Sequence, residues 1–142
     1  MKKKILLSVF IIFLVLALIG CTGVTPVIPD EYQEEIIKEV VSNYWSALSN
    51  RQYELAKSYC ILNGTFYLGA EEYQDMPYFG FATSTWEAYF NYIEINKNNA
   101  KANIDITLTV TVCFENICSS ESETLYNYPM YLTKINGAWK LK

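Results

Sequence analysis

The sequence predicts an α+β fold in which helices come first and a curved, four-stranded antiparallel meander sheet follows. Three observations support this prediction. Residues 31–49 have apolar side chains at helical spacing, residues 100–114 alternate between apolar and polar side chains, and Asn136-Gly137 is a strong hairpin-turn signal. The chain has 142 residues, which suits one domain of this kind.

The composition argues against several functional classes. The chain has no His, and its net charge is −4. Domains that bind nucleic acid carry a basic footprint, so we expect no nucleic-acid partner. His is the commonest general base and metal ligand. Because the Cys residues also lack the His partners of a zinc site, we expect no metal and no other cofactor.

Residues 1–20 have the composition of a secretory signal peptide. Three Lys residues follow Met1, and residues 5–19 are uncharged. As a helix this run would be ~22 Å long, which is short of the ~30 Å hydrocarbon core of a bilayer. A cationic start and a short apolar run are typical of a signal peptide. An uncleaved anchor helix remains the alternative, and both readings place the remaining chain outside the cytoplasm.

The end of this run, Leu18-Ile19-Gly20-Cys21, resembles the lipobox of prokaryotic lipoproteins. The resemblance implies that cleavage falls before Cys21 and that Cys21 is lipidated. The protein would then be anchored to the cell membrane through its lipid and would face outside the cytoplasm. Two or three acyl chains hold a protein stably at ~0.8 kcal/mol per buried methylene. Residues 21–29 would form the lipidated Cys and a short extended tether, and residues 30–142 a single α+β domain.

Two helices are expected at the start of the domain. The first spans residues 31–49, with Asp30 as N-cap and Gln33 completing a capping box. The second is shorter and spans residues 52–60, and its inward side chains are expected to be Leu55, Ala56 and Tyr59. Because two helices this short cannot bury their apolar stripes on each other alone, we expect them to pack on a sheet.

Residues 61–85 show no periodicity that assigns them to a helix or a strand. They contain three Gly residues and a high density of aromatic side chains. These aromatic side chains either line the mouth of a pocket or close the open end of the sheet. The candidate pocket residues are Phe66, Tyr67, Tyr78, Phe79 and Phe81.

Residues 86–96 are expected to form a strand that pairs with the alternating segment 100–114 through a turn at residues 96–99. The expected buried face holds Tyr89, Ile93 and Ile95, and the other face holds Trp86, Phe90 and Tyr92. Either a two- or a four-residue loop pairs the two Ile residues with even-numbered residues of the next strand, so the apolar faces match.

A hairpin with Glu115-Asn116 as its loop places Cys113 directly opposite Cys118. At a non-hydrogen-bonded pair the Cα atoms approach to ~4.5 Å, which is within disulfide range. In an exported protein we therefore expect a cross-strand disulfide, with Cys60 left as an unpaired, buried helix residue.

The same register places Ser119, Glu121 and Glu123 on the apolar face. We therefore expect a β-bulge between Ser119 and Thr124 that restores an apolar face. The residues that the bulge would bury are Tyr126, Tyr128, Met130 and Leu132. The final turn at Asn136-Gly137 pairs Ile135 with Ala138 and Leu132 with Leu141.

Two stretches of the chain are similar to the nuclear transport factor 2-like superfamily. The first is Tyr44-Trp45-x-Ala47-Leu48 with Tyr53-x-x-Ala56, and the second is Leu132-x-Lys134-x-x-Gly137-x-Trp139-Lys140-Leu141. The resemblance implies a cone-shaped fold with helices on the concave face of the sheet, and it is greatest to the small lipoprotein members. The superfamily includes ketosteroid-isomerase-like and polyketide-cyclase-like enzymes with an Asp or His base in the cone.

Three functions remain open at this stage. The leading hypothesis is a membrane-anchored, extracytoplasmic binding or interaction domain without chemistry, whose partner is an unknown protein. The second is a cone that binds a small apolar or sugar-like ligand among the candidate pocket residues. The third is an isomerase- or lyase-type enzyme that uses a buried Asp75 with a raised pKa. Asp30 is assigned to the cap and Asp105 to the polar strand face, so no catalytic residue carries over from the family.

Overall fold

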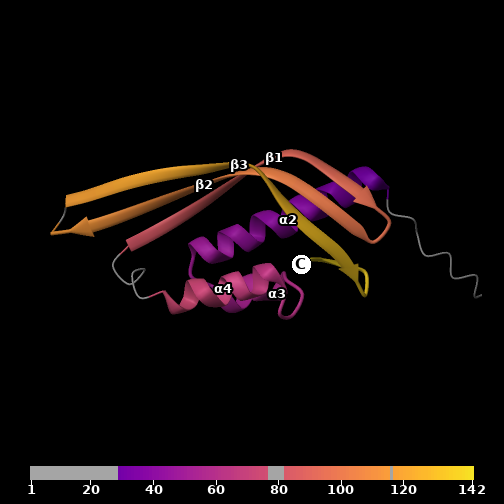
Figure 1. The fold of residues 1–142 in the computed structure, drawn as a ribbon, viewed down its shortest axis with the longest axis horizontal. Helices are drawn as coiled ribbons and strands as arrows, with labels where there is room; N and C mark the ends of the chain where they lie inside the picture. The colour runs from indigo at the N-terminus through magenta and orange to yellow at the C-terminus, as the bar shows by residue number, and fades with distance from the viewer. Residues whose placement is uncertain (1–28, 77–81, 116) are drawn as a thin grey trace, which may run out of the picture.

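The computed structural model describes residues 29–76, 82–115 and 117–142. Within these residues, three helices precede a sheet of four antiparallel strands in the order β1-β2-β3-β4, which confirms the α+β meander (Figure 1). The elements are α2 (Asp30–Ser49), α3 (Tyr53–Ser58), α4 (Thr65–Asp75), β1 (Ala82–Asn96), β2 (Asn99–Phe114), β3 (Ile117–Ile135) and β4 (Ala138–Leu141). None of the helices in this part of the chain is long and apolar enough to cross a membrane. The expected signal peptide, Cys21 and most of the tether lie outside the described residues.

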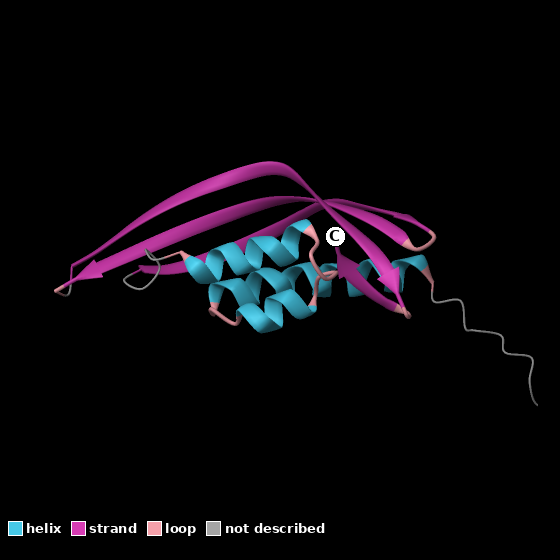
Figure 2. Ribbon diagram, turned by 60° about the horizontal axis from the view of Figure 1, so that its bottom comes forward, coloured by secondary structure: helices cyan, strands magenta, loops and turns pink. Residues whose placement is uncertain are grey.

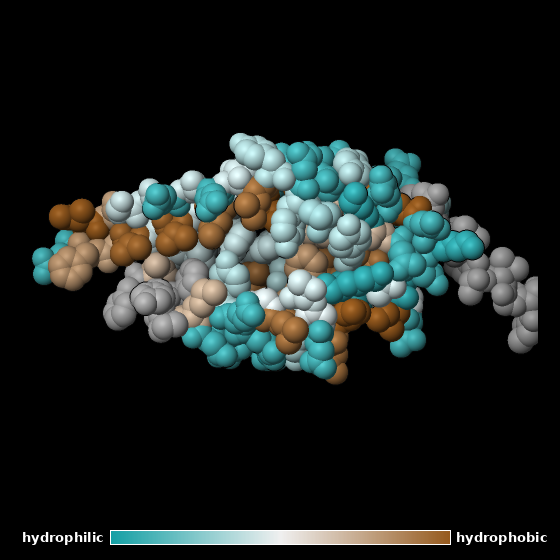
Figure 3. Space-filling model, viewed as in Figure 1, coloured by the Kyte–Doolittle hydropathy of each residue, from teal (hydrophilic) through white to brown (hydrophobic). Residues whose placement is uncertain are grey.

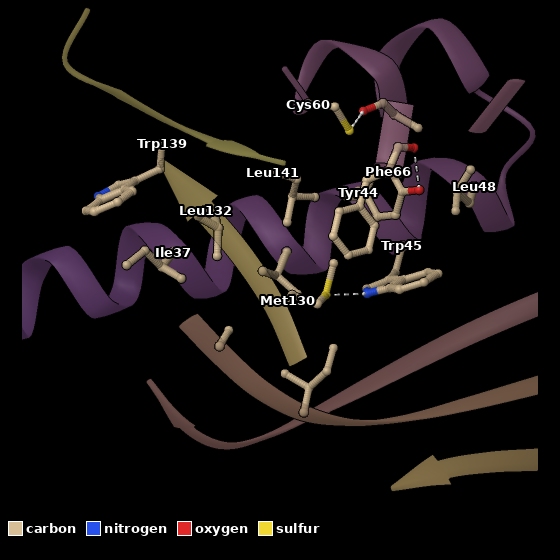
Figure 4. Close-up of a cluster of buried hydrophobic side chains, with 14 of the residues drawn as sticks. Ile37, Tyr44, Trp45, Leu48, Cys60, Phe66, Met130, Leu132, Trp139 and Leu141 are labelled. Atoms are coloured by element: carbon tan, nitrogen blue, oxygen red, sulfur yellow. Dashed lines mark hydrogen bonds between the residues drawn. The ribbon is translucent and has the colours of Figure 1, made fainter. Parts of the chain in front are cut away.

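The sheet arches over the helices, which lie on its concave face (Figure 2). The apolar stripe of α2 packs between the sheet and the two shorter helices, as Figure 4 shows in close-up. The core formed in this way includes Ile37, Val41, Tyr44, Trp45 and Leu48 from α2, and Ile104, Ile106, Met130, Leu132 and Leu141 from the strands.

The start of α2 differs from the expected capping box. The helix begins at Asp30, Pro29 occupies the cap position, and no side-chain capping hydrogen bond forms there. The Pro29 carbonyl accepts the Gln33 N–H at 3.2 Å. The Gln33 side chain is used elsewhere, because its Oε1 accepts hydrogen bonds from Lys134 Nζ at 2.9 Å and Trp139 Nε1 at 3.1 Å. Tertiary contacts with the C-terminal hairpin therefore replace the local cap.

The region after α2 contains one helix more than the sequence indicates. α3 is shorter than expected, and Leu55 is exposed rather than inward, whereas Ala56 is buried. Cys60 is free and buried as expected, but it follows α3 and forms a bridge with Leu141 instead of lying in the helix. Burial raises the pKa of the Cys60 thiol to about 12.

The unexpected helix, α4, depends on contacts with the end of the chain. Gly64 occupies its N-cap position, and a Cβ atom there would lie 2.8 Å from the backbone carbon of Lys142. The Phe66 N–H donates to the Lys142 carbonyl at 3.4 Å. These contacts join residues almost eighty positions apart, so a local sequence pattern does not reveal them.

The strand registers follow the expected hairpins at three turns. Ile93 lies opposite Ala102, and Ile95 lies opposite Ala100. Cys113 lies opposite Cys118, and the structure contains the disulfide between them. The last hairpin pairs Ile135 with Ala138 and Leu132 with Leu141, and Asn136 and Gly137 both have positive φ, as a tight hairpin turn requires.

The faces of β1 were assigned wrongly over its first half. A bulge between Phe90 and Tyr92 shifts the register by one residue at Asn91. As a result Trp86 and Phe90 pack against the core, whereas Tyr89 is 61% exposed. Beyond the bulge the order reverses, and Ile93 and Ile95 pack against the core as expected.

The expected bulge between Ser119 and Thr124 is also absent. The register of β2 and β3 shifts instead between Ile104 and Ile106, at Tyr126 and Asn127. Tyr126 is consequently 72% exposed, whereas Tyr128 is half-buried and both Met130 and Leu132 are buried. Ser119, Glu121 and Glu123 stay on the apolar face. They are exposed there because the helices do not extend over that part of the sheet.

The two bulges are joined across β2 by a group of polar side chains that we name the bulge cluster: Asn91, Asn103, Asp105 and Asn127. Asp105 Oδ1 accepts hydrogen bonds from Asn91 Nδ2 at 2.8 Å and from the Asn127 backbone N–H at 2.8 Å. Asn103 Oδ1 accepts from Asn91 Nδ2 at 3.0 Å, and Asn103 Nδ2 donates to the Asn127 carbonyl at 3.2 Å. The cluster therefore ties the bulge of β1 to the bulge of β3.

Beyond the bulges the sheet extends past the helices. We name this part the overhang; it comprises residues 107–114 of β2 and 117–125 of β3, whereas the β1 residues beside it, such as Trp86, still contact α2. The even-numbered side chains of β2 are buried from Ala100 to Ile106, half-buried at Leu108 and Val110, and exposed at Val112 and Phe114. The alternating ribbon thus has one covered half and one uncovered half (Figure 1).

We predict that the bulge cluster makes stability depend on pH below about 4. The hydrogen bond from the Asn127 backbone and the one from the Asn91 side chain lower the pKa of Asp105 in the folded state. A carboxylate with a lowered folded pKa adds stability above its unfolded pKa of ~3.9, and this stability is lost as pH falls through the folded value. Urea unfolding should therefore find Asp105→Asn less stable than wild type at pH 7, with a gap that narrows below pH ~4.

Glu94→Gln, on the same convex face, is the matched control. It should leave the pH dependence of the free energy of unfolding below pH ~4 as it is in wild type. A stability gap between wild type and Asp105→Asn that stays constant down to pH ~2.5 would contradict the role given to the Asp105 carboxylate.

Candidate functional site

A cavity of about 460 Å³ lies between α2, α4 and the concave face of the sheet, at the boundary between the covered half and the overhang. Its walls are mostly apolar and aromatic. The lining residues are Tyr44, Trp45, Leu48, Thr65, Phe66, Leu68, Gly69, Glu72, Tyr73, Trp86, Ile106, Leu125 and Tyr128. A concave, apolar cavity of this size with a few polar groups is the usual form of a small-molecule site.

The α2 wall is fixed by hydrogen bonds whose donors are already occupied. The Tyr44 hydroxyl donates to the Phe66 carbonyl at 2.9 Å, and the two rings meet edge to face with centroids 5.6 Å apart. Burial raises the pKa of Tyr44, so its hydroxyl stays neutral. The Trp45 indole N–H donates to the sulfur of Met130 at 3.4 Å (Figure 4). This wall therefore presents fixed aromatic surface.

Trp86 is positioned by both backbone and ring contacts. Its backbone N–H donates to Ser49 Oγ at 2.9 Å. Its indole stacks on Trp45 with centroids 4.7 Å apart and an interplanar angle of 30°, and it meets the Tyr73 ring edge to face at 5.6 Å. Two rings thus hold the Trp86 side chain in the cavity wall, and Ser49 of α2 fixes its backbone.

The Trp86 indole N–H has no hydrogen-bond acceptor among the described residues, although its nitrogen is buried. A buried donor without a partner costs ~1–3 kcal/mol, and most such groups in native proteins are satisfied. Trp86 thus combines an unsatisfied donor with a place in the cavity wall.

The mouth of the cavity opens at Leu68, Glu72 and Leu125, which are all exposed. Glu72 is the carboxylate among the described lining residues. A carboxylate suited to proton abstraction at neutral pH is normally removed from water, so that its pKa rises toward the working pH. An exposed Glu72 at the mouth lacks that environment. The cavity therefore has a mostly apolar interior and a solvated carboxylate at its mouth.

The sequence-predicted pocket residues are only partly brought together. Phe66 lines the cavity, but Tyr67 does not. The Lys57 ammonium lies over the Tyr67 ring, 5.4 Å from the ring centroid. Tyr78, Phe79 and Phe81 lie outside the described residues.

The hypothesis of a buried Asp75 base is not supported. Asp75 is the last residue of α4, it is exposed, and it does not line the cavity. Asp105 belongs to the bulge cluster on the convex face, as the strand pattern indicates.

Sequence reasoning missed three of the residues that define the cavity. Tyr44 and Trp45 were taken as members of a helical core stripe and of the family-like motif, and not as cavity residues. Trp86 was assigned to the wrong face of β1 because the bulge at Asn91 was not foreseen. A polar Asn91 between Phe90 and Tyr92 in an otherwise aromatic strand was the signal available for that bulge.

Solved structures with the same architecture support the expected fold family. A nuclear transport factor 2-like superfamily protein from Salmonella enterica aligns with a TM-score of 0.57 at 15% identity, covering 80% of this chain and 88% of that protein. A nuclear transport factor 2-like protein with a cystatin-like fold from Novosphingobium aromaticivorans aligns at 0.53 and 10% identity, covering 76% of each chain. A conserved protein from Planctomyces limnophilus aligns at 0.58 and 14% identity, covering 78% and 91%.

At the level of sequence, no protein-family model matches the chain, and no curated protein matches it. The structural likenesses occur at identities of 15% or less, so they establish the fold alone. The described domain thus has an α+β cone fold similar to that of these nuclear transport factor 2-like proteins, and the cavity lies inside the cone.

Proposed function

We propose that this protein is a lipid-anchored, extracytoplasmic binding protein without chemistry, and that its cone holds a small, largely apolar ligand with one hydrogen-bond acceptor. The observation that carries the proposal is the buried indole N–H of Trp86, which has no acceptor among the described residues and belongs to a residue of the aromatic cavity wall. A carbonyl or ether oxygen on a flat molecule would satisfy this donor while the rings around it cover the apolar part.

The cavity suits such a ligand in size and in wall chemistry. Its volume of about 460 Å³ falls within the ~300–1,000 Å³ of typical ligand sites. The fixed rings of Tyr44, Phe66 and Trp45 offer offset or edge-on contacts to a flat molecule. The hydroxyl of Tyr44 and the N–H of Trp45 are already bonded within the protein. Orientation of the ligand would therefore depend mainly on Trp86.

Binding is favoured over catalysis by the state of the ionisable groups. Glu72 is exposed at the mouth, and Asp75 lies outside the cavity. Burial raises the pKa of Tyr44 and that of Tyr73, so both hydroxyls are neutral. A neutral phenol does not act as the base that abstracts a proton from a substrate. A proton-abstracting site needs a group whose pKa is matched to the working pH, and the described lining lacks one in a suitable setting.

The anchoring part of the proposal rests on the lipobox-like segment that ends at Cys21 and on the charge pattern before it. Two or more acyl chains would hold the protein at the membrane, and residues 22–29 would separate the lipid from α2 by roughly 25 Å. The domain would then sample ligands close to the outer face of the membrane.

We predict that the cavity distinguishes 1-tetralone, a ring ketone, from tetralin, the hydrocarbon of the same skeleton. Because a neutral hydrogen bond contributes ~0.5–1.5 kcal/mol, the ketone should bind about two- to tenfold more tightly. The chain has three Trp residues, so ¹⁵N spectra resolve the indole N–H signals individually. The Trp86 signal should shift with 1-tetralone and stay nearly unchanged with tetralin.

Trp86→Phe keeps a ring but removes the donor, so it should abolish the preference for the ketone. Trp139→Phe is the matched control, because the Trp139 N–H is bonded to Gln33 outside the cavity. It should leave the preference intact. Equal preference in wild type and Trp86→Phe, or no binding of either compound, would reject the proposed ligand mode.

We further predict that the purified protein begins at a lipidated Cys21. Intact mass spectrometry after production in a bacterial host should find a chain that lacks residues 1–20 and carries a diacylglyceryl group. Cys21→Ser should accumulate the uncleaved precursor. An intact Met1 terminus with an unmodified Cys21 would contradict the proposed lipid anchor. It would not affect the proposal for the cavity.

A further inference from the structure

The overhang presents an uncovered apolar face at the end of the molecule. Phe114 and Ile117 are 75% and 78% exposed, and Val112 and Leu125 are both 48% exposed. Figure 3 shows hydrophobic surface gathered at the end where the β2–β3 hairpin lies. Contiguous exposed apolar surface on a soluble domain usually marks a site of interaction.

This face belongs to a well-connected part of the sheet. The disulfide between Cys113 and Cys118 joins the two strands next to the turn. On the opposite face, three pairs of hydroxyl side chains are hydrogen-bonded across β2 and β3 at 2.8–2.9 Å: Thr107 with Thr124, Thr109 with Ser122, and Thr111 with Ser120. The apolar side chains are therefore presented by a braced hairpin.

On the β3 side of the apolar stripe the charged side chains are negative, whereas on the β1 side Arg51 donates a hydrogen bond to the carbonyl of Ala82, the residue opposite Val112. Glu121 lies directly opposite Val110, and Glu123 lies directly opposite Leu108, both on the concave face. No Lys or Arg occurs in residues 82–96 or in residues 102–133. A partner that fits this face must therefore offer apolar side chains together with positive charge on one side.

We propose that the concave face of the overhang is the docking surface for an amphipathic helix of a partner protein, with Lys or Arg along the side that faces β3. The stripe from Leu108 to Phe114 is ~20 Å long, which matches a helix of about 13 residues. The spacing from Glu121 to Glu123 is ~6.8 Å along the strand, close to the ~6 Å rise between helix positions i and i+4. Two basic residues at that spacing would each meet one Glu.

A helix is the natural occupant because α2 already packs in this way on the covered half of the same face. The partner helix would continue that layer over the uncovered half. A second copy of this chain fits less well, because it would bring a second acidic face and not the positive charge that complements Glu121 and Glu123. A membrane surface fits less well too, because anionic headgroups repel an acidic face.

The test uses the full chain in nanodiscs of neutral lipid and a fluorescein-labelled designed peptide of 14 residues. Leu residues occupy one helical stripe of the peptide, and Lys residues fill the remaining positions. A second peptide has Glu in place of Lys, and a third has the Leu/Lys composition in scrambled order. Fluorescence anisotropy, with empty nanodiscs as blank, should show binding of the amphipathic Leu/Lys peptide at least about tenfold tighter than binding of the other two.

Glu121→Lys with Glu123→Lys should weaken the Leu/Lys peptide about tenfold and favour the Leu/Glu peptide. The matched control, Glu87→Lys with Glu94→Lys, makes the same charge change on the convex face and should have little effect. Val112→Thr with Phe114→Thr should weaken both amphipathic peptides. All positions changed are exposed, and thermal unfolding verifies that each variant folds.

Three results would overturn the proposal. If Glu87→Lys with Glu94→Lys weakened peptide binding as much as Glu121→Lys with Glu123→Lys, the loss would come from the change in net charge and not from this face. Crosslinking of wild type into a dimer that Val112→Thr with Phe114→Thr abolishes would assign the face to a second copy. Adhesion to added lipid vesicles that is lost in the same variant would assign it to a membrane.

Discussion

A single carboxylate on the convex face organises the curvature on which the remaining structure depends. Asp105 accepts one hydrogen bond from Asn91 in β1 and one from the backbone of Asn127 in β3, so it joins the bulges of the two outer strands across β2. Bulges bend and twist a sheet, and two of them at one level concentrate the bend there. The bend divides the alternating ribbon into a half that the helices cover and a half that they leave open.

The cavity and the overhang are two consequences of this division. Where the covered half ends, Ile106 and Trp86 still face the helices, and the space between them and α4 becomes the cavity. Farther along, the side chains on the same face are no longer covered, so Val112 and Phe114 reach solvent. Apolar side chains on one continuous strand therefore serve as core, as cavity wall and as exposed surface in succession.

Local chemistry explains which features the sequence predicted well. The turns at Asn136-Gly137 and between Cys113 and Cys118 depend on a few adjacent residues, and their registers were predicted correctly. The position of the β3 bulge was predicted wrongly, because only half of the apolar ribbon is buried and Glu121 can therefore stay on its apolar face in contact with solvent. α4 and the face of Trp86 depend on contacts with Lys142 and on the bulge at Asn91, which no local pattern encodes.

The central claim, that Asp105 holds the bend between the covered half and the overhang, is tested most directly by an electron–electron distance measurement. One spin label is placed at Gln74 on α4 and the other at Glu121 on the overhang, and both positions are exposed. The distance between the two labels spans the bend. The account predicts one narrow distance distribution in wild type and a broader or displaced distribution in Asp105→Ala. The same narrow distribution in both proteins would contradict it.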